Sequence, residues 1–418
     1  MTIDFKKASF KDFENIPGWD AFQTADEFQR YLNFLRENGH LNYRIESLSP
    51  VGPEMQLRLP GKTSATNAIC LVSNDYLGFS QHPKIKEAVI KSIREFGTGS
   101  GASPAIGGHF SYHQELEARI AAFYRRQDAI LYTTGYTANS ASLQCLLHPE
   151  DIAILDMAVH ASVYEGCLNT NTKQFIHNNL EHLEQILKLS KDKYRTKFVI
   201  VDGVYSQDGD IAILDEIASL THQYGGYLVV DDAHGIGVVG ETGRGVIEMF
   251  NLFDQVDIIT GTFSKALGNI GGYVIAKAEV VYYLKYQSKQ HLFSTTATPA
   301  IGGIIRAIEL IDEEPQWKAS LWDNITYLKS GLISLGFDVG TTASAVIPVK
   351  IGEIAKTLEA GNLLLKAGVY ANPIMYPAVS RKNARIRMNV MATHTKAHLD
   401  KVLNAFADID LKLNLTSK

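Results

Sequence analysis

Between residues 129 and 276 the chain alternates short apolar runs with helix-like stretches. The apolar runs are AILYTTG, DIAILD, KFVIVDG, YLVVDDA, DIITGT and GYVIA. Runs that are apolar on both faces are typical of strands in a mostly parallel sheet that helices cover on both sides. We therefore predict an α/β domain with a large, mostly parallel sheet.

Two amphipathic helices are predicted before these strands. In HPKIKEAVIKSIREFG (82–97) apolar residues recur at helical spacing from Ile85 to Phe96, Pro83 suits the first turn and Gly97 ends the helix. The second helix, SYHQELEARIAAFY (111–124), starts with the spacing of a capping box.

The pattern changes on both sides of residues 66–300, which we assign to the large domain. Residues 1–65 are polar, with a helix-like piece at 25–38, and predict an N-terminal arm that leans on another part of the protein. After Pro299, helical stretches lead to the strand-like segments IPVKI, GVYANPI and ARIRMNV and to a last helix. This order predicts a smaller C-terminal α+β domain over 301–418.

Composition narrows the class of protein. The 418 residues carry a formal charge of -5 without a basic block, which argues against nucleic acid and against electrostatic attachment to a membrane. Three scattered cysteines indicate neither a disulfide framework nor a metal cluster. No signal-peptide core and no 18-residue apolar run is present, so we expect a cytoplasmic protein without a transmembrane segment.

Polar residues follow the predicted strands, where ligands bind in sheets of this kind. The strand ends carry one acid, two imidazoles, several hydroxyls, a helix start and one lysine: Gly135 and Tyr136, His160, Ser206, Asp231 and His234, Thr262, and Lys265. Because the carboxyl ends of parallel strands meet at one edge, we expect these side chains to converge there.

Lys265, in GTFSKALGNIGG, is the most informative of these residues. Small and glycine neighbours at the end of a buried strand are a poor setting for a solvated lysine, whereas an amine in a partly dry site can form a Schiff base with a carbonyl. A phosphate-binding P-loop would need Ser or Thr after the lysine, and Ala266 stands there. The glycine-rich stretch 97–108 follows a helix rather than a strand, so we interpret it as a loop near the site and not as a dinucleotide fingerprint.

The set as a whole predicts a pyridoxal phosphate (PLP) site. Lys265 would bind the aldehyde, and Asp231 would keep the pyridine nitrogen cationic so that the ring withdraws electrons. His160 would face the ring, and Ser206 and His234 would contact its phenolic oxygen. Backbone N–H groups at a helix N-terminus suit a phosphate, so we assign that group to Gly135, Tyr136 and Thr262.

Several motifs resemble the α-oxoamine synthases, PLP enzymes of fold type I. They are SNDYLGFS (73–80), HQELE (113–117), DDAHGIGVVG (231–240), GTFSKALGNIGG (261–272), LFSTTATPA (292–300) and IRMNVMATHT (386–395). The resemblance runs from about residue 70 to residue 410 in the family's order. It implies a large PLP-binding domain and condensation of an amino acid with an acyl-CoA thioester, with loss of the amino acid's carboxylate as carbon dioxide.

The resemblance also implies roles for further residues. Lys265 would remove the Cα proton, Arg387 would bind the substrate carboxylate, and Asn74 would line the site. Ser294 would reach the phosphate of the neighbouring subunit, which implies a homodimer with shared active sites. The N-terminal arm has no counterpart that we can assign.

Within the family, GTFSK, ANPIMYPAV and MATHT look closest to bacterial serine palmitoyltransferases. The alternatives are 2-amino-3-ketobutyrate CoA ligase (glycine C-acetyltransferase), 8-amino-7-oxononanoate synthase and a cysteate acyltransferase. Pro104 replaces an arginine frequent in the family and His109 is unusual there, so the amino acid and the acyl chain stay open. Functions of other classes are an aminotransferase, an inactive partner subunit, which would lack Lys265, and a nucleotide-binding module.

Overall fold

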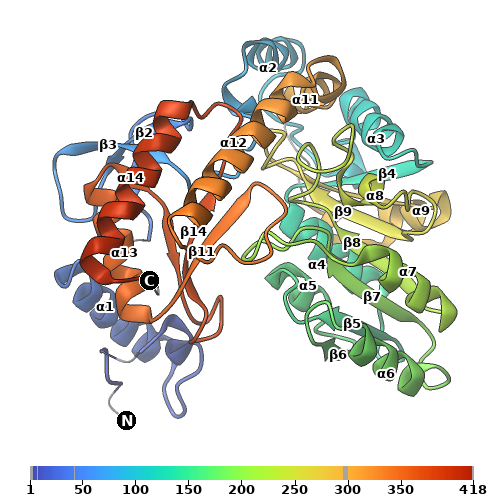
Figure 1. Ribbon diagram of the computed structural model, residues 1–418. Helices are drawn as coiled ribbons and strands as arrows, with labels where there is room; N and C mark the ends of the chain where they lie inside the picture. The colour runs from blue at the N-terminus through green and yellow to red at the C-terminus, as the bar shows by residue number, and fades with distance from the viewer. Residues whose placement is uncertain (1–2, 7, 42, 295–299, 417–418) are drawn as a thin grey trace. The chain divides into compact units, whose positions relative to one another are not determined.

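The computed structural model describes residues 3–6, 8–41, 43–294 and 300–416. Its contacts divide the chain into two compact units (Figure 1). The α/β unit comprises Asn74–Trp322 and Ala343–Ala345, and the α+β unit comprises Met1–Ser73, Asp323–Thr342 and Val346–Lys418. Part of the LFSTTATPA motif, residues 295–299, lies outside the described residues.

This division differs from the expected one at both borders. We expected the large domain to end at residue 300, but helix α11 (Ile301–Glu313) packs against helices α2 and α3 of the α/β unit, so the border falls inside helix α12 (Gln316–Ser334). We also predicted an N-terminal arm over 1–65 that leans on another part of the protein. Its strand β2 pairs with β3, and β3 pairs with β12 from the C-terminal part of the chain, so this segment belongs to the α+β unit.

The α/β unit is built around one sheet of seven strands within the described residues. The strand order is β4-β10-β9-β8-β7-β5-β6; β10 is antiparallel to its neighbours, and β9, β8, β7, β5 and β6 run parallel. The predicted mostly parallel sheet is confirmed. The strands are β4 (Asp128–Tyr132), β5 (Ile152–Asp156), β6 (Asn171–Phe175), β7 (Lys197–Asp202), β8 (Tyr227–Asp231), β9 (Ile258–Thr262) and β10 (Gly272–Ala276).

Helices connect and cover these strands. They are α2 (Pro83–Phe96), α3 (Ser111–Phe123), α4 (Gly135–Leu146), α5 (Ala161–Gly166), α6 (Leu180–Ser190), α7 (Leu214–Gln223), α8 (Gly245–Met249), α9 (Ala278–Gln287) and α10 (Lys289–Leu292), with short 3-10 turns at Phe79–Gln81 and Pro104–Ile106. The pattern at 82–97 and 111–124 predicted α2 and α3 to within a residue. Strand β6 was not predicted, because NTKQF is polar and four of its five residues are exposed at the sheet's edge.

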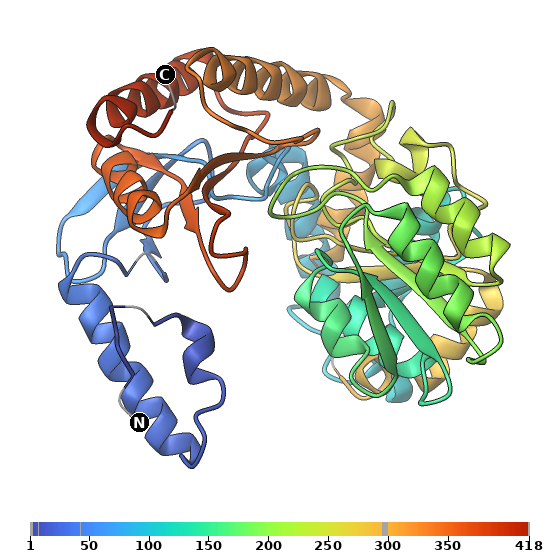
Figure 2. The ribbon, with the colours of Figure 1, turned by 60° about the horizontal axis from the view of Figure 1, so that its bottom comes forward.

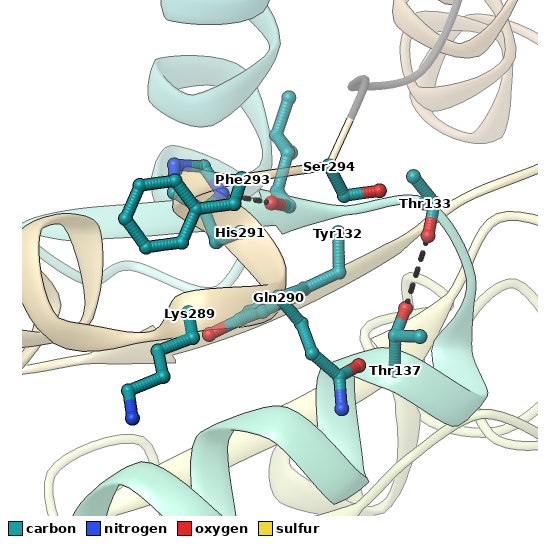
Figure 3. Close-up of a pocket in the computed structure, with 9 residues that line it drawn as sticks. Tyr132, Thr133, Thr137, Lys289, Gln290, His291, Phe293 and Ser294 are labelled. Carbon is teal, nitrogen blue, oxygen red and sulfur yellow. Dashed lines mark hydrogen bonds between the residues drawn. The ribbon is translucent and has the colours of Figure 1, made fainter. Parts of the chain in front are cut away.

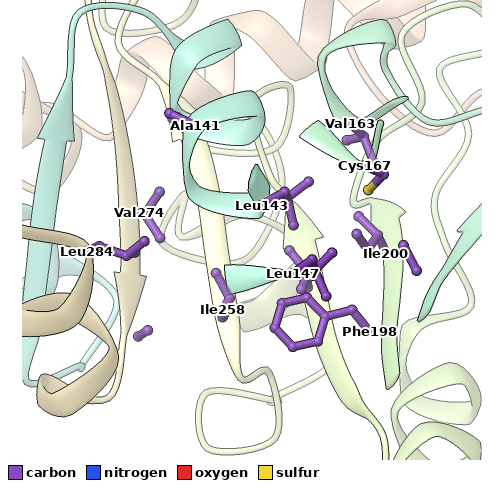
Figure 4. Packing of buried hydrophobic residues seen from close by; sticks show 14 of the residues in the cluster. Ala141, Leu143, Leu147, Val163, Cys167, Phe198, Ile200, Ile258, Val274 and Leu284 are labelled. Atoms are coloured by element: carbon purple, nitrogen blue, oxygen red, sulfur yellow. The ribbon is translucent and has the colours of Figure 1, made fainter. Parts of the chain in front are cut away.

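The core on one face of the sheet lies under α4, α5 and α9. Figure 4 shows Ala141 and Leu143 of α4, and Leu147 just after this helix, over Phe198 and Ile200 of β7 and Ile258 of β9. Strand β7 is buried along its whole length, which explains why KFVIVD is apolar on both faces. This packing holds α4 and α5 so that both helices begin at the carboxyl edge of the sheet.

The described part of the α+β unit contains two small sheets. One has the order β1-β2-β3-β12 and the other β11-β14-β13. The segment GVYANPI, predicted as one strand, divides into β12 and β13, which pair in different sheets. The elements are α1 (Ala21–Glu37), β1 (Glu46–Ser47), β2 (Glu54–Arg58), β3 (Ala65–Cys70), β11 (Val346–Gly352), α13 (Ile354–Lys366), β12 (Val369–Tyr370), β13 (Asn372–Ile374), β14 (Ala384–Asn389) and α14 (Lys396–Leu413), with a 3-10 turn at Phe10–Phe13.

The N-terminal segment has an apolar cluster of its own. Helix α1 lies beside the residues that precede it (Figure 2), and Phe13, Ile16 and Tyr31 are buried between them. The rings of Phe13 and Tyr31 stack with centroids 4.9 Å apart, and the Tyr31 hydroxyl donates to the Ala8 carbonyl over 2.8 Å. Aromatic residues therefore order this segment, although its overall composition is polar.

Among the described helices, none combines the length and the apolar character that crossing a membrane requires.

The β5 core supplies a test of the packing. Leu155 is fully buried, whereas Leu189 on α6 is 78% exposed. We predict that Leu155→Ala lowers the free energy of unfolding by about 2–5 kcal/mol, because it leaves a cavity. Leu189→Ala should change it by less than about 0.5 kcal/mol. Urea denaturation measures both, and equal effects would contradict the assigned core.

Candidate active site

The carboxyl ends of β7, β8 and β9 surround a cavity of about 230 Å³ in the α/β unit. The N-terminal part of α4 and the N-cap residue of α5 contribute to its wall. Its wall includes residues that the sequence predicted to converge: Gly135, Tyr136, His160, Ser206, Asp231, His234, Thr262 and Lys265. Thr134, Asn139, Asp202, Val204, Ala233 and Ser264 complete it.

Asp231 is the last residue of β8 and is only 7% exposed. Its Oδ2 accepts a hydrogen bond from Asn139 Nδ2 over 2.6 Å, and its Oδ1 accepts one from the Ala233 backbone N–H over 3.0 Å. Asn139 Nδ2 lies 3.0 Å from Ser162 Oγ as well, which fixes the amide. Donors on both oxygens favour a charged carboxylate at this position.

Asp202 ends the neighbouring strand β7, in register with Asp231, and is 3% exposed. Burial raises the pKa of Asp202 well above its ordinary value, and the adjacent charge of Asp231 raises it further. Two buried carboxylates side by side cannot both ionise cheaply. Asp202 is therefore the member of this pair that favours the uncharged, protonated form.

His160 is the N-cap residue of α5 and faces the cavity. Its Nδ1 lies 2.8 Å from Ser162 Oγ, and its backbone N–H donates to Asp202 Oδ1 over 3.3 Å. Reduced hydration lowers the pKa of His160, more than Asp231 raises it, and the charge of Lys265 lowers it too. At neutral pH the imidazole is thus uncharged. The Tyr136 ring stands edge-on to it, with centroids 5.9 Å apart.

His234 is held from behind by Tyr76. The Tyr76 hydroxyl and His234 Nδ1 form a hydrogen bond of 2.6 Å, and both side chains are buried. The same hydroxyl lies 3.3 Å from Asn74 Oδ1. Asn74, predicted to line the site, is therefore outside the cavity wall and connects to it through Tyr76 and His234.

The first turn of α4 lies tightly against β9. A Cβ added at Gly135 would come 2.6 Å from Thr262 Cβ, so only glycine lets the helix N-terminus approach this strand. The Thr134 hydroxyl caps the helix by accepting from Thr137 N over 3.0 Å. The N–H groups at the start of the helix have no intrahelical partner and suit an anion.

The hydroxyl of Thr262 is engaged elsewhere in this structure. It donates to the Gly271 carbonyl over 2.9 Å and accepts from Ser264 N over 3.1 Å. Ser264 Oγ lies 2.8 Å from it and is itself in the cavity wall. Ser264 is therefore better placed than Thr262 to turn a hydroxyl toward a phosphate.

Ser294 lines a second cavity, of about 320 Å³, rather than the one that holds Lys265. Figure 3 shows Ser294 and Phe293 on one side of it, Lys289 and Gln290 on another, and Thr133 with Thr137 of the α4 turn. The two cavities thus lie at the same helix N-terminus, since Thr134 and Gly135 line the first and Thr133 and Thr137 the second.

Arg387 belongs to the α+β unit. It lies in β14, is 8% exposed and pairs with Pro348 of β11 and Asn372 of β13 across the sheet. Its predicted contact with a substrate carboxylate stays a prediction.

The donor set in the first cavity fits PLP. An amine on Lys265 suits an aldehyde, the Asp231 carboxylate suits a protonated ring nitrogen, and the α4 N-terminus suits a phosphate. A lysine, a charged acid and a helix N-terminus at the carboxyl edge of a mostly parallel sheet define a PLP-dependent enzyme.

The sequence and the fold match known proteins. Residues 66–406 match the model of the family described as aminotransferase class I and II. The 8-amino-7-oxononanoate synthase of Thermoanaerobacter pseudethanolicus is 40% identical over 394 residues, 92% of this chain and 98% of that protein. The 8-amino-7-oxononanoate synthase 1 of Bacillus subtilis is 36% identical, over 92% of this chain and 97% of that protein.

Solved structures of serine palmitoyltransferase share the fold. The enzyme from S. paucimobilis, solved with a bound PLP–myriocin aldimine, is 29% identical with a TM-score of 0.89 and covers 95% of this chain and 100% of its own. The Sphingomonas wittichii enzyme gives the same identity and TM-score over 96% of this chain. This chain belongs to the class I and II aminotransferase family and, within it, to the α-oxoamine synthases, PLP-dependent acyltransferases of fold type I.

Asp202, Asn139 and Tyr76 were not predicted as site residues. Asp202 ends a predicted strand, but the prediction for that strand fell on Ser206 beyond it. Asn139 lies one turn inside α4, and Tyr76 precedes the whole sheet, so neither carries a strand-end signal. Tyr76 does fall in the SNDYLGFS motif beside Asn74, and that was the available clue.

Gly135 provides a test of the anion site. We predict that Gly135→Ala weakens PLP binding on the order of tenfold, because overpacking of about 1–3 kcal/mol must push the α4 turn away from Thr262. Gly331→Ala is the matched control, since its Cβ would come 2.5 Å from Leu403 Cδ1 in the α+β unit. Equilibrium titration with PLP compares them. Wild-type affinity in Gly135→Ala would refute the assignment.

Proposed function

We propose that this protein condenses an α-amino acid with an acyl-CoA thioester, releasing CoA and carbon dioxide and leaving an aminoketone. The observation that carries the proposal is the cavity that Lys265 shares with Asp231, His160 and His234 in a chain that belongs to the α-oxoamine synthases. PLP, when bound, supplies an electrophilic carbonyl and an electron-withdrawing ring.

The chain's own residues divide the work. Asp231, whose oxygens accept hydrogen bonds from Asn139 and the Ala233 N–H, would hold a proton on the ring nitrogen. His160 would pack against the ring, and the Lys265 amine would bind the carbonyl and move the proton at the amino acid's Cα. Ser206 and His234 would contact the phenolic oxygen, and Tyr76 orients His234.

The amino acid and acyl group are proposed from the relatives. The name 8-amino-7-oxononanoate describes a nine-carbon acid with an amine next to a ketone. Decarboxylating condensation of alanine with a seven-carbon ω-carboxyacyl thioester gives that product. Relatives of that name are 36–40% identical to this chain, which supports this pair as the first candidate.

Serine with a palmitoyl thioester is the second candidate. It is the pair that GTFSK and MATHT favoured, and the fold of serine palmitoyltransferase extends over 95% of this chain. The two candidates differ at the far end of the acyl group, which is a carboxylate in the first and a methyl in the second.

Thiol release discriminates among these functions. We predict release of free CoA when the holoenzyme receives an amino acid and an acyl-CoA without any keto acid. Alanine, serine, glycine and cysteate, each with dicarboxylic and long-chain acyl-CoA, identify the pair. Amino transfer to a keto acid without thiol release would overturn the condensation and favour an aminotransferase.

Lys265 is tested by covalent trapping. We predict that borohydride reduction of the wild-type holoenzyme fixes PLP on the peptide that contains Lys265, as intact mass and peptide mapping will show. Lys265→Ala should bind PLP but retain none after reduction and denaturation. Lys277→Ala, at an exposed position, should label as the wild type does. Labelling of another lysine in wild type would refute the assignment.

Arg387 is tested through substrate affinity. We predict that Arg387→Ala raises the KM for the amino acid on the order of tenfold or more, because a charged hydrogen-bonding partner is lost. Arg387→Lys should recover only part of the lost affinity for the amino acid. The visible spectrum of bound PLP should not change in either variant. An unchanged KM in Arg387→Ala would contradict the proposed role of Arg387 in binding the substrate carboxylate.

We also propose that the enzyme acts as a cytoplasmic homodimer in which Ser294 of one subunit reaches the phosphate of the other. Its place on the Thr133–Thr137 side of the α4 turn, near the proposed phosphate site, supports this.

A further inference from the structure

His177 lies outside the cavity wall, between two carboxylates. Its Nδ1 is 3.0 Å from Asp156 Oδ1 and 3.1 Å from Oδ2, and its Nε2 is 2.8 Å from Asp210 Oδ2. Asp156 is fully buried at the carboxyl end of β5, and Asp210 is 9% exposed in the segment that follows β7. With both ring nitrogens directed at carboxylates, the imidazole is a doubly paired cation.

The neighbouring groups keep this cation charged. Burial lowers the pKa of His177, but the hydrogen bonds and charges of Asp156 and Asp210 outweigh burial and raise it to about 10. Tyr205 stands edge-on to the ring with centroids 4.3 Å apart. Because the pKa lies above the ordinary value of 6.5, the stabilisation is complete below that pH and is lost as the pH rises through about 10.

Through Asp210, His177 binds the loop 203–212. This loop places Val204 and Ser206 in the cavity wall. The loop doubles back on itself, since Tyr205 N donates to Asp210 O over 3.0 Å and Ala212 N donates to Gly203 O over 3.2 Å. Asp210 therefore sits directly across from Tyr205, the residue before Ser206. A shift at Asp210 would be passed to Ser206 through this short closed loop.

Asn178 makes further hydrogen bonds to this loop and to the residue just after it. Its Nδ2 donates to the Ile211 carbonyl over 3.1 Å, and its Oδ1 accepts from the Ile213 N–H over 3.3 Å. Its backbone N–H donates to Asp156 Oδ2 over 3.0 Å. Residues 177 and 178 thus join the end of β5 to the returning side of the loop, at residues 210, 211 and 213.

We propose that His177 is a positioning residue: its imidazolium ties the loop 203–212 to the end of β5 and thereby holds Ser206 in the wall of the PLP cavity. His177 was not predicted from the sequence. The link to PLP rests on the role proposed for Ser206, whereas the tie itself concerns the loop alone.

The other end of β5 offers a matched control. Asp151, just before this strand, is also fully buried, and it accepts from Arg195 Nε over 2.9 Å and from Arg195 Nη2 over 2.6 Å. This second ion pair lies at the opposite end of the strand from the cavity. Loss of Arg195 should weaken the same strand without touching the loop.

The test uses His177→Gln, Asp210→Asn, the double variant and Arg195→Met. In His177→Gln, Asp156 and Asp210 lose their shared cation and repel each other. We predict that amide hydrogen exchange of residues 203–212 in the cofactor-free protein speeds up on the order of tenfold, and that the PLP dissociation constant rises by a similar factor. Adding Asp210→Asn removes the repulsion. The double variant should therefore recover most of the slow exchange of the loop and most of the PLP affinity.

Arg195→Met should lower the unfolding temperature but leave the exchange of the loop and the PLP affinity near wild type. The tie is overturned if exchange of 203–212 in His177→Gln matches wild type, if Arg195→Met speeds it equally, or if the double variant shows no recovery. Faster loop exchange with unchanged PLP affinity would overturn the link to Ser206 and leave the condensation reaction untouched. Should His177→Gln fail to fold, Asp210→Asn alone must give a smaller increase in exchange, and no increase refutes the tie.

Discussion

The central physical constraint in this protein is that one carboxylate must stay charged inside a largely dry site. Burying an unpaired charge costs several kcal/mol, and a second acid beside it makes ionisation harder still. Asp231 meets this constraint with hydrogen-bond donors on both oxygens, and burial raises the pKa of the neighbouring Asp202 so that Asp202 favours the uncharged form. The electron-withdrawing power of a bound pyridine ring depends on that one retained charge.

The rest of the α/β unit serves to place groups around this carboxylate. Parallel strands bring Asp202, Asp231 and Thr262 to one edge, and the packed faces of α4 and α5 aim their N-termini at it. Gly135 lets α4 approach β9 closely enough for its N–H groups to meet an anion. Ion pairs at both ends of β5 indicate that the ends of the strands, where chain direction changes, are held by charge as well as by packing.

The sequence pattern predicted much of this arrangement, because buried strands and helix faces are built from apolar residues at regular spacing. Strands such as KFVIVD are buried on both faces, and the residues that follow them converge at the carboxyl edge, so Asp231, His234 and Lys265 could be named in advance. The roles of Asn139 and His177 could not be predicted, because their partners lie far away in the sequence and such contacts leave no local sequence pattern. The domain borders were missed for a similar reason, since β3 pairs with β12 across about 300 residues of intervening chain.

The most direct measurement of the central claim is the protonation state of the pyridine nitrogen, from the ¹⁵N chemical shift of labelled PLP bound to the protein. The account predicts a protonated nitrogen in the wild type and an unprotonated one in Asp231→Asn. An unprotonated nitrogen in the wild type, or a protonated one in both proteins, would contradict it.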